Sequence, residues 1–277
     1  MSETIRDTAS DRDTASDPTR LAGNVALITG AGSGIGAATA RLFAESGASV
    51  VVQDLDEAAA ERVAAEITRA GGAAAASGGD VRSEKDCRRA VETAVQQFGG
   101  LDTVFCNAGV FEPGTVENQS LDDWDLQIDT LLKGTFLTCR AAVPALRARG
   151  GGSIVLSGSN CAHIGCQGRF AYTAAKSAMP VLAKQLSNDY FHSAGIRANC
   201  VSPGFVLTEM TTETWRRQTG AEPGTPVPDH VAEKWQSPLA IAQTVAFLAS
   251  DASSDIAGVT IPISRTGLLR VAMMRMV

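Results

Sequence analysis

This sequence of 277 residues has little of what marks several classes of protein. Aromatic residues make up only 5% of it, and it contains three histidines. Lysine and arginine total 24 against 30 aspartates and glutamates, so the formal net charge is −6 and no basic patch predicts nucleic-acid binding. No apolar run approaches the roughly 18 residues that a membrane-spanning helix needs. We therefore expect neither a nucleic-acid nor a membrane partner.

The six cysteines also lack the spacing of a metal site, so no metal is expected. Cys161 and Cys166 are the only close pair. Because no N-terminal signal peptide is apparent, we expect reduced thiols and a cytoplasmic protein.

The first 20 residues differ in character from the rest. They contain a tandem repeat, R-D-T-A-S-D at 6–11 and again at 12–17, followed by Pro18. This segment offers almost no apolar surface to bury, so we expect residues 1–20 to be a disordered extension. The remainder, 21–277, has the length of one large α/β domain.

Within 21–277, apolar runs alternate with helical patterns. The runs predict strands at 25–28, 49–52, 103–106, 153–157, 197–201 and 258–263. Helices are predicted at 37–44, from 56 to about 70, at 83–98, at 124–149 and at 238–250. Most runs are continuously apolar, as in parallel strands covered on both faces. The order predicts a Rossmann-like, doubly wound parallel sheet with helices on both faces.

A glycine-rich turn follows the first predicted strand. The segment 29–36 reads T-G-A-G-S-G-I-G and leads directly into a helix. Glycines at such a turn let the backbone approach a pyrophosphate, which the amides and dipole of the helix terminus attract. Asp54 ends the second strand, where a carboxylate holds ribose hydroxyls and repels a 2′-phosphate. Since no Lys or Arg lies in 30–36 or directly after Asp54, we expect NAD(H) rather than NADP(H).

Tyr172 and Lys176 lie four residues apart in Y-T-A-A-K, with Ser159 thirteen residues before the tyrosine. On a helix, this spacing places the phenol and the ammonium on one face. The lysine charge would stabilise a phenolate and bring its pKa toward neutrality. Such a phenol can exchange a proton with an alcohol or a ketone.

Taken together, these residues resemble the short-chain dehydrogenase/reductase family, over about residues 21–267. The motifs are T-G-x-x-x-G-I-G at 29–36, N-A-G at 107–109, Ser159 with Tyr172 and Lys176, and Pro203-Gly204 followed by Thr208. The resemblance implies that Ser159 positions the substrate oxygen, that Tyr172 transfers the proton, and that Lys176 binds the nicotinamide ribose and lowers the tyrosine pKa. It also implies a homotetramer, with a dimer as the alternative.

The resemblance and the glycine-rich turn together predict the cofactor site. Its expected members are Gly30, Ser33, Gly34, Ile35, Gly36, Asp54, Leu55, Asp80, Val81, Asn107, Ala108, Gly109, Tyr172, Lys176, Pro203, Gly204, Val206 and Thr208. One position departs from the family: Leu131 stands where an Asn usually completes a catalytic tetrad and holds a relay water. Leucine cannot hydrogen-bond that water.

The segment 205–237 is too long for a plain connection and contains clustered prolines and glycines, so we expect a substrate lid. The expected substrate contacts are Ser159, Cys161, His163, Tyr172, Phe205, Met210 and Trp215. They predict a mid-sized, largely apolar substrate without charge pairing. The apolar, methionine-rich tail 268–277 is expected to dock on a neighbouring subunit.

The sequence thus predicts an NAD-dependent oxidoreductase that interconverts a secondary alcohol and a ketone. Two alternatives stay open. One is an enzyme of the same fold without net redox, such as a dehydratase, epimerase or cyclase, which Leu131 favours. The other is a non-catalytic NAD-binding sensor, against which the Ser159, Tyr172 and Lys176 set argues.

Overall fold

A computed structural model describes residues 21–265 of the chain; the expected extension 1–20 and the expected docking tail 268–277 lie outside that part. Its centre is a parallel sheet of seven strands in the order β3-β2-β1-β4-β5-β6-β7. The strands are β1 (Val25–Thr29), β2 (Ser49–Asp54), β3 (Ala73–Gly78), β4 (Thr103–Cys106), β5 (Gly152–Ser157), β6 (Ile196–Pro203) and β7 (Thr260–Ile263). The predicted doubly wound parallel fold is confirmed.

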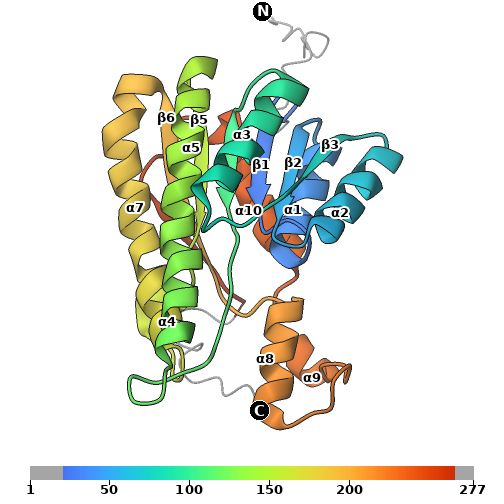
Figure 1. The fold of residues 1–277 in the computed structure, drawn as a ribbon, viewed down its shortest axis with the longest axis vertical. Helices are drawn as coiled ribbons and strands as arrows, with labels where there is room; N and C mark the ends of the chain where they lie inside the picture. Colours follow the sequence, from blue (N-terminus) through green and yellow to red (C-terminus); the bar gives the residue numbers. More distant parts are fainter. Residues whose placement is uncertain (1–20, 266–277) are drawn as a thin grey trace, which may run out of the picture.

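Helices cover both faces of this sheet (Figure 1). They are α1 (Gly34–Glu45), α2 (Glu57–Arg69), α3 (Glu84–Phe98), α4 (Leu121–Ile128), α5 (Gly134–Arg149), α6 (Cys161–Ile164), α7 (Phe170–Ala194), α8 (Glu209–Thr219), α9 (Asp229–Ala232) and α10 (Pro238–Ala249). A short 3-10 helix, η2 (Asp251–Ser253), follows α10. No helix within residues 21–265 is long and apolar enough to cross a membrane.

Two hydrophobic cores lie on opposite faces of the sheet. One joins α1, α2 and α10 through Phe43, Val63 and Leu248. The other joins α3, α5 and α7 through Val91, Leu146 and Met179. Because successive residues of a strand point to opposite faces, β1 contributes to both cores, and its five residues are all buried.

Local signals in the sequence set several helix starts. Ser83 accepts a hydrogen bond from the backbone amide of Asp86 at the start of α3, and Ser237 does the same for Leu239 before the first-turn proline of α10. The predicted helix 124–149 is not continuous. A π-helical turn, η1 (Asp129–Lys133), separates α4 from α5, because Gly134 donates its amide to the carbonyl of Asp129, five residues back.

Candidate active site

Helix α7 carries Tyr172 and Lys176 on one face, as their spacing predicts. Lys176 is 5% exposed, and its Nζ donates a hydrogen bond of 2.6 Å to the carbonyl of Ser157 at the end of β5. The same ammonium lies 5.9 Å from the centre of the Tyr172 ring. The end of β5 therefore fixes the lysine beside the tyrosine.

Burial shifts both groups away from their ordinary ionisation. It lowers the pKa of Lys176 to about 8. It raises the pKa of the Tyr172 phenol, and a hydrogen bond with Ser159 and the positive charge of Arg169 oppose that rise. The net shift of Tyr172 is upward, which corrects the expectation that Lys176 brings it toward neutrality. The physical reason is that loss of hydration on burial disfavours the charged phenolate and outweighs both opposing contributions.

The glycine-rich loop joins β1 to α1 and packs against the end of β4. Gly30 has a φ of +63°, and a Cβ there would lie 2.7 Å from the Cα of Ala108. The side-chain amide of Asn107 donates to the carbonyls of Thr29 and Gly30, each at 3.1 Å. A Cβ at Gly36 would collide with the carbonyl of Gly30. These contacts let the loop lie close to the strand ends, with its backbone toward the cavity.

Asp54 lies where β2 ends, and backbone amides orient its carboxylate. One oxygen accepts from the amide of Gly32 at 2.8 Å, and the other accepts from the amide of Asp56 at 3.0 Å. Sequence reasoning missed Arg62 of α2, whose Nη2 donates to the Gly32 carbonyl at 2.9 Å. Arg62 lies eight residues after Asp54 in the sequence. Its position on α2 nevertheless places its side chain against the glycine-rich loop.

A cavity of about 400 Å³ runs along the carboxyl ends of the strands. Its lining includes Gly30, Ser33, Gly34, Ile35, Asp54, Leu55, Asp80, Val81, Asn107, Ala108, Gly109, Tyr172, Lys176 and Thr208. Its lining also contains Arg82, which pairs with Asp80 at 2.7 Å and lowers the pKa of that carboxyl.

The remaining residues of the predicted cofactor set lie elsewhere. Gly36 packs against the glycine loop, and Val206 is buried in the hydrophobic core and pairs with Gln236 in an isolated parallel β-bridge. Pro203 and Gly204 line a second cavity.

The first cavity fits an elongated dinucleotide. It begins at a helix N-terminus whose glycine loop leaves space for a pyrophosphate, passes a carboxylate aligned for ribose hydroxyls at Asp54, and ends at Tyr172 and Lys176. It lies beside β1 and β4, where the strand order reverses. In parallel α/β sheets, this switch point is where such ligands bind.

Leu131 lies inside the π-helical turn and closes one wall of this cavity. It is 1% exposed, and its Cδ2 would be 3.2 Å from a Cβ placed at Gly109. Its carbonyl accepts a 2.7 Å hydrogen bond from the Thr135 hydroxyl. Leu131 is thus packed apolar surface, with its backbone oxygen already bonded.

A second cavity, of about 70 Å³, adjoins the first. Its lining includes five of the seven expected substrate contacts: Ser159, Cys161, Tyr172, Phe205 and Met210. Tyr172 and Met210 line both cavities. The phenol of Tyr172 therefore lies where the two cavities meet.

Five lining residues of this second cavity were not predicted as site residues: Phe111, Asn160, Arg169, Thr211 and Thr214. Arg169 immediately precedes α7, and its guanidinium lies over the rings of Phe111 at 4.4 Å and Phe205 at 5.9 Å. Asn160 is 1% exposed, and neither atom of its amide group has a hydrogen-bond partner among the described residues. An unsatisfied buried polar group of this kind costs about 1–3 kcal/mol. For Asn160 and Arg169, the one signal in the sequence was their position between Ser159 and Tyr172.

The structure does not bring His163 and Trp215 to either cavity lining. The Nε2 of His163 lies 3.1 Å from the Ser202 hydroxyl. Trp215 is 6% exposed and packs with Val231 and Trp235 in a small cluster within the predicted lid. Its role there is to hold α8 and α9 together.

Cys161 and Cys166 form a disulfide, which corrects the expectation that all thiols are reduced. The short helix α6 turns the chain so that their Cα atoms lie 5.3 Å apart, within the range that a disulfide bridges. Cys87, Cys106, Cys139 and Cys200 are free and buried. The bond ties down the loop between Ser159 and Tyr172.

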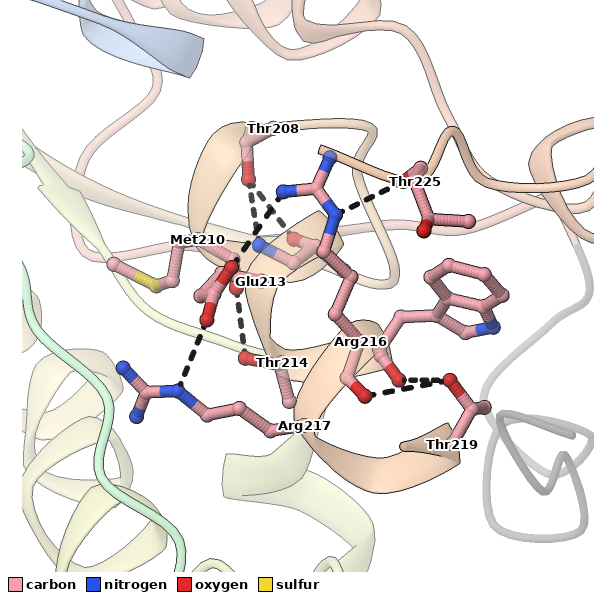
Figure 2. A network of polar contacts seen from close by, with 10 residues as sticks. Thr208, Met210, Glu213, Thr214, Arg216, Arg217, Thr219 and Thr225 are labelled. Carbon is pink, nitrogen blue, oxygen red and sulfur yellow. Dashed lines mark hydrogen bonds and ion pairs between the residues drawn. The ribbon is translucent and has the colours of Figure 1, made fainter. Parts of the chain in front are cut away.

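The expected lid, 205–237, contains α8 and α9, which extend beyond one end of the sheet (Figure 1). Figure 2 shows the polar contacts that fix α8: Thr208 caps its start, and Glu213 accepts from Arg217. Arg217 also pairs with Glu112, in the loop after β4, at 3.1 Å. This ion pair connects the lid to the opposite side of the second cavity.

Comparisons with known proteins agree with this geometry. A family model described as "Enoyl-(Acyl carrier protein) reductase" matches residues 30–265. The chain is 41% identical over 235 residues to a cyclohexanol dehydrogenase of Acinetobacter sp. (strain SE19), covering 84% of this chain and 90% of the relative. It is 39% identical over 250 residues to a trans-4-hydroxycyclohexanecarboxylate dehydrogenase of Sinomonas cyclohexanicum, covering 88% and 92%.

A solved structure is also similar. The crystal structure of a short-chain type dehydrogenase/reductase from Mycobacterium marinum superposes with a TM-score of 0.81 at 33% identity, covering 90% of this chain and 96% of that one.

Proposed function

Because this chain belongs to the short-chain dehydrogenase/reductase family, an oxidoreductase family that uses nicotinamide cofactors, we propose that it is an NAD-dependent dehydrogenase of ring secondary alcohols. The observation that carries the proposal is the position of Tyr172, which lines both the cofactor-sized cavity and the smaller second cavity. A proton-transferring phenol at that junction is placed to act on an alcohol held in one cavity beside a cofactor held in the other.

In the oxidation, the alcohol carbon loses a hydride and its oxygen loses a proton, so that a ketone forms. The nicotinamide cofactor, when bound, accepts that hydride or returns it in reduction. Ser159 holds the alcohol oxygen, and Tyr172 takes the proton. Lys176, with a pKa lowered to about 8, is still mainly charged at neutral pH and stabilises the negative charge that develops on the phenol oxygen.

The choice of NAD over NADP rests on Asp54. Its carboxylate is aligned by two backbone amides at the end of β2 and carries a negative charge toward the ribose end of the cavity. This charge favours hydroxyls and opposes a 2′-phosphate.

The choice of a ring alcohol is supported by the names of the two relatives, both of which act on hydroxylated six-membered rings. The walls of the second cavity suit such a ring, because Phe111, Phe205 and Met210 present apolar surface next to Ser159 and Tyr172.

The test is to incubate the purified protein with NAD⁺ or NADP⁺ and a panel that includes cyclohexanol, a primary alcohol and a sugar alcohol, while recording the absorbance of the reduced cofactor. We expect NADH formation with the ring alcohol and a higher kcat/KM for NAD⁺ than for NADP⁺. No reduced cofactor with any alcohol, and no consumption of NADH with cyclohexanone, would refute the proposal and favour an enzyme of this fold without net redox.

A further inference from the structure

The disulfide between Cys161 and Cys166 adjoins the second cavity. Cys161 lies two residues after Ser159, is 8% exposed and belongs to the lining of that cavity. Cys166 follows five residues later and is partly exposed. The bond therefore joins a wall of the cavity to a part of the loop that solvent reaches.

The backbone that carries Cys161 also holds Ser159. The amide of Cys161 donates to the Oγ of Ser159 at 3.2 Å, and the amide of Ala162 donates to the Ser159 carbonyl at 3.0 Å. The Ser159 side chain is in turn hydrogen-bonded to Tyr172. Because the Cys161 amide occupies one acceptor position of the hydroxyl, it restricts the rotation of the Ser159 side chain. The start of α6 thus sets the direction in which Ser159 meets the phenol.

Little besides the disulfide holds the loop around Cys166. Helix α6 is a single turn of four residues, closed by the amide of Gly165, which donates to the Cys161 carbonyl at 3.0 Å. So short a helix is not stable by itself. A Cβ at Gly165 or at Gly168, on either side of Cys166, would meet no atom of the described residues within 4 Å. This part of the loop is therefore loosely packed, and the covalent bond is what constrains it.

We propose that the Cys161–Cys166 disulfide positions Ser159 for the reaction, and that its reduction lowers the rate of alcohol oxidation. A dithiol supplies two electrons and two protons, so that the S–S bond becomes two thiols and the dithiol becomes a disulfide. Once Cys161 is released from Cys166, the α6 turn opens and its amide no longer fixes the Ser159 hydroxyl. The effect on rate rests on the proposed function, whereas the effect on the loop does not.

The response is specific because this is the one disulfide among the described residues. The other four cysteines, Cys87, Cys106, Cys139 and Cys200, are free and buried. Thiol–disulfide exchange needs access of a thiolate to a disulfide sulfur, and the partly exposed Cys166 provides it. A change of activity on reduction is therefore assigned to this bond.

The first test needs no turnover. Thiol titration of unfolded protein that was purified without reductant should find four thiols, and six after treatment with dithiothreitol. Hydrogen exchange of the folded protein should become faster in the segment 159–168 after reduction and stay unchanged in α1. Six thiols before reduction, or exchange in 159–168 that reduction does not change, would overturn the inference whatever the catalytic activity.

The second test measures kcat/KM for cyclohexanol with saturating NAD⁺. Reduction of the unaltered protein should lower it about two- to tenfold, mainly through kcat, as expected for the loss of one hydrogen bond, with the Kd of NAD⁺ unchanged. Cys166→Ser breaks the bond but keeps the cavity wall, so it should match the reduced protein and no longer respond to dithiothreitol. Gln167→Ala, an exposed change in the same loop, is the matched control and should behave like the unaltered protein.

Ser159→Ala separates positioning from a general effect on the loop. If the disulfide acts through the Ser159 hydroxyl, reduction should cause no further loss in the residual activity of Ser159→Ala. An equal loss in Ser159→Ala and in the unaltered protein would refute the positioning role. Equal kcat/KM of the oxidised and reduced unaltered protein would also refute it, while leaving the proposed dehydrogenase intact.

Discussion

The two cavities that meet at Tyr172 are built in different ways. The larger one is lined mostly by residues at or just after the ends of β1 to β5, which the sheet topology brings together, and helices add further walls to it, among them Leu131 of η1 and Lys176 of α7. The smaller one is lined by side chains from the loops after β4, β5 and β6 and from α8. A cavity fixed by the sheet is constrained to one kind of ligand, whereas a cavity made by loop side chains can change its ligand without changing the fold.

The largest effect should come from the residue that the two cavities share. Tyr172→Phe removes the phenol proton but keeps the ring, so turnover should fall about 10²-fold or more while NAD⁺ binding is largely kept. Tyr190 lies on the same helix, with the guanidinium of Arg147 over its ring. Tyr190→Phe is therefore the matched control, and it should leave turnover and NAD⁺ binding nearly unchanged. Steady-state kinetics and NAD⁺ titration measure both. Near-normal turnover in Tyr172→Phe would refute the assigned proton transfer.

A smaller effect is expected at the ribose end of the larger cavity. Asp54→Ala removes the charge that opposes a 2′-phosphate, so the ratio of kcat/KM for NADP⁺ to that for NAD⁺ should rise about tenfold, or about 1.4 kcal/mol. The exposed carboxylate of Glu61, on α2, provides the control change Glu61→Ala. In the double variant Asp54→Ala with Arg62→Gln, the rise in relative kcat/KM for NADP⁺ should be smaller. The reason is that Arg62, which contacts Gly32, is the nearby cation that could attract the 2′-phosphate once Asp54 is removed. If the ratio of kcat/KM for NADP⁺ to that for NAD⁺ is unchanged in Asp54→Ala, the Asp54 carboxylate does not determine which cofactor the protein prefers.

The smallest effect on turnover is expected at Leu131. Leu131→Asn buries an amide where the packing is apolar and the backbone carbonyl already has a partner, so the free energy of unfolding should fall by about 1–3 kcal/mol. We expect no gain in kcat. Leu121→Asn, at a site that is 79% exposed, should leave the melting temperature almost unchanged. A Leu131→Asn protein that is both more stable and faster would indicate a proton relay that lacks its polar group.

The difference between the cavities also decides how much could be predicted from the sequence. The glycine-rich turn, Asp54, and the pair Tyr172 and Lys176 are local patterns, and the parallel sheet brings them to one edge. The strand β3 was not predicted, because its run of alanines at 73–76 lacks the β-branched residues that mark strands. The π-helical turn at Leu131 was also missed, because a single extra residue in a helix leaves no periodic signal.

The second cavity was less predictable, since its members come from separate loops. Arg169 and Phe111 meet only because Gly114 pairs with the chain before α7, a contact between residues far apart in sequence. Trp215 is a large apolar residue in the lid, and the sequence did not reveal that it packs inward on Trp235. The Cys161–Cys166 bond depends on the turn made by α6, which the short loop pattern did not specify.

The most direct test of the central claim is to follow deuterium from cyclohexanol labelled at the carbinol carbon into NAD⁺ and to compare the rates with labelled and unlabelled alcohol. If the alcohol lies in the second cavity against the cofactor in the first, one deuterium per turnover should appear in the reduced nicotinamide, and Tyr172→Phe should slow the transfer about 10²-fold or more, as it does turnover. Cyclohexanone formation without deuterium in the cofactor, or no transfer from any labelled ring alcohol, would contradict the account.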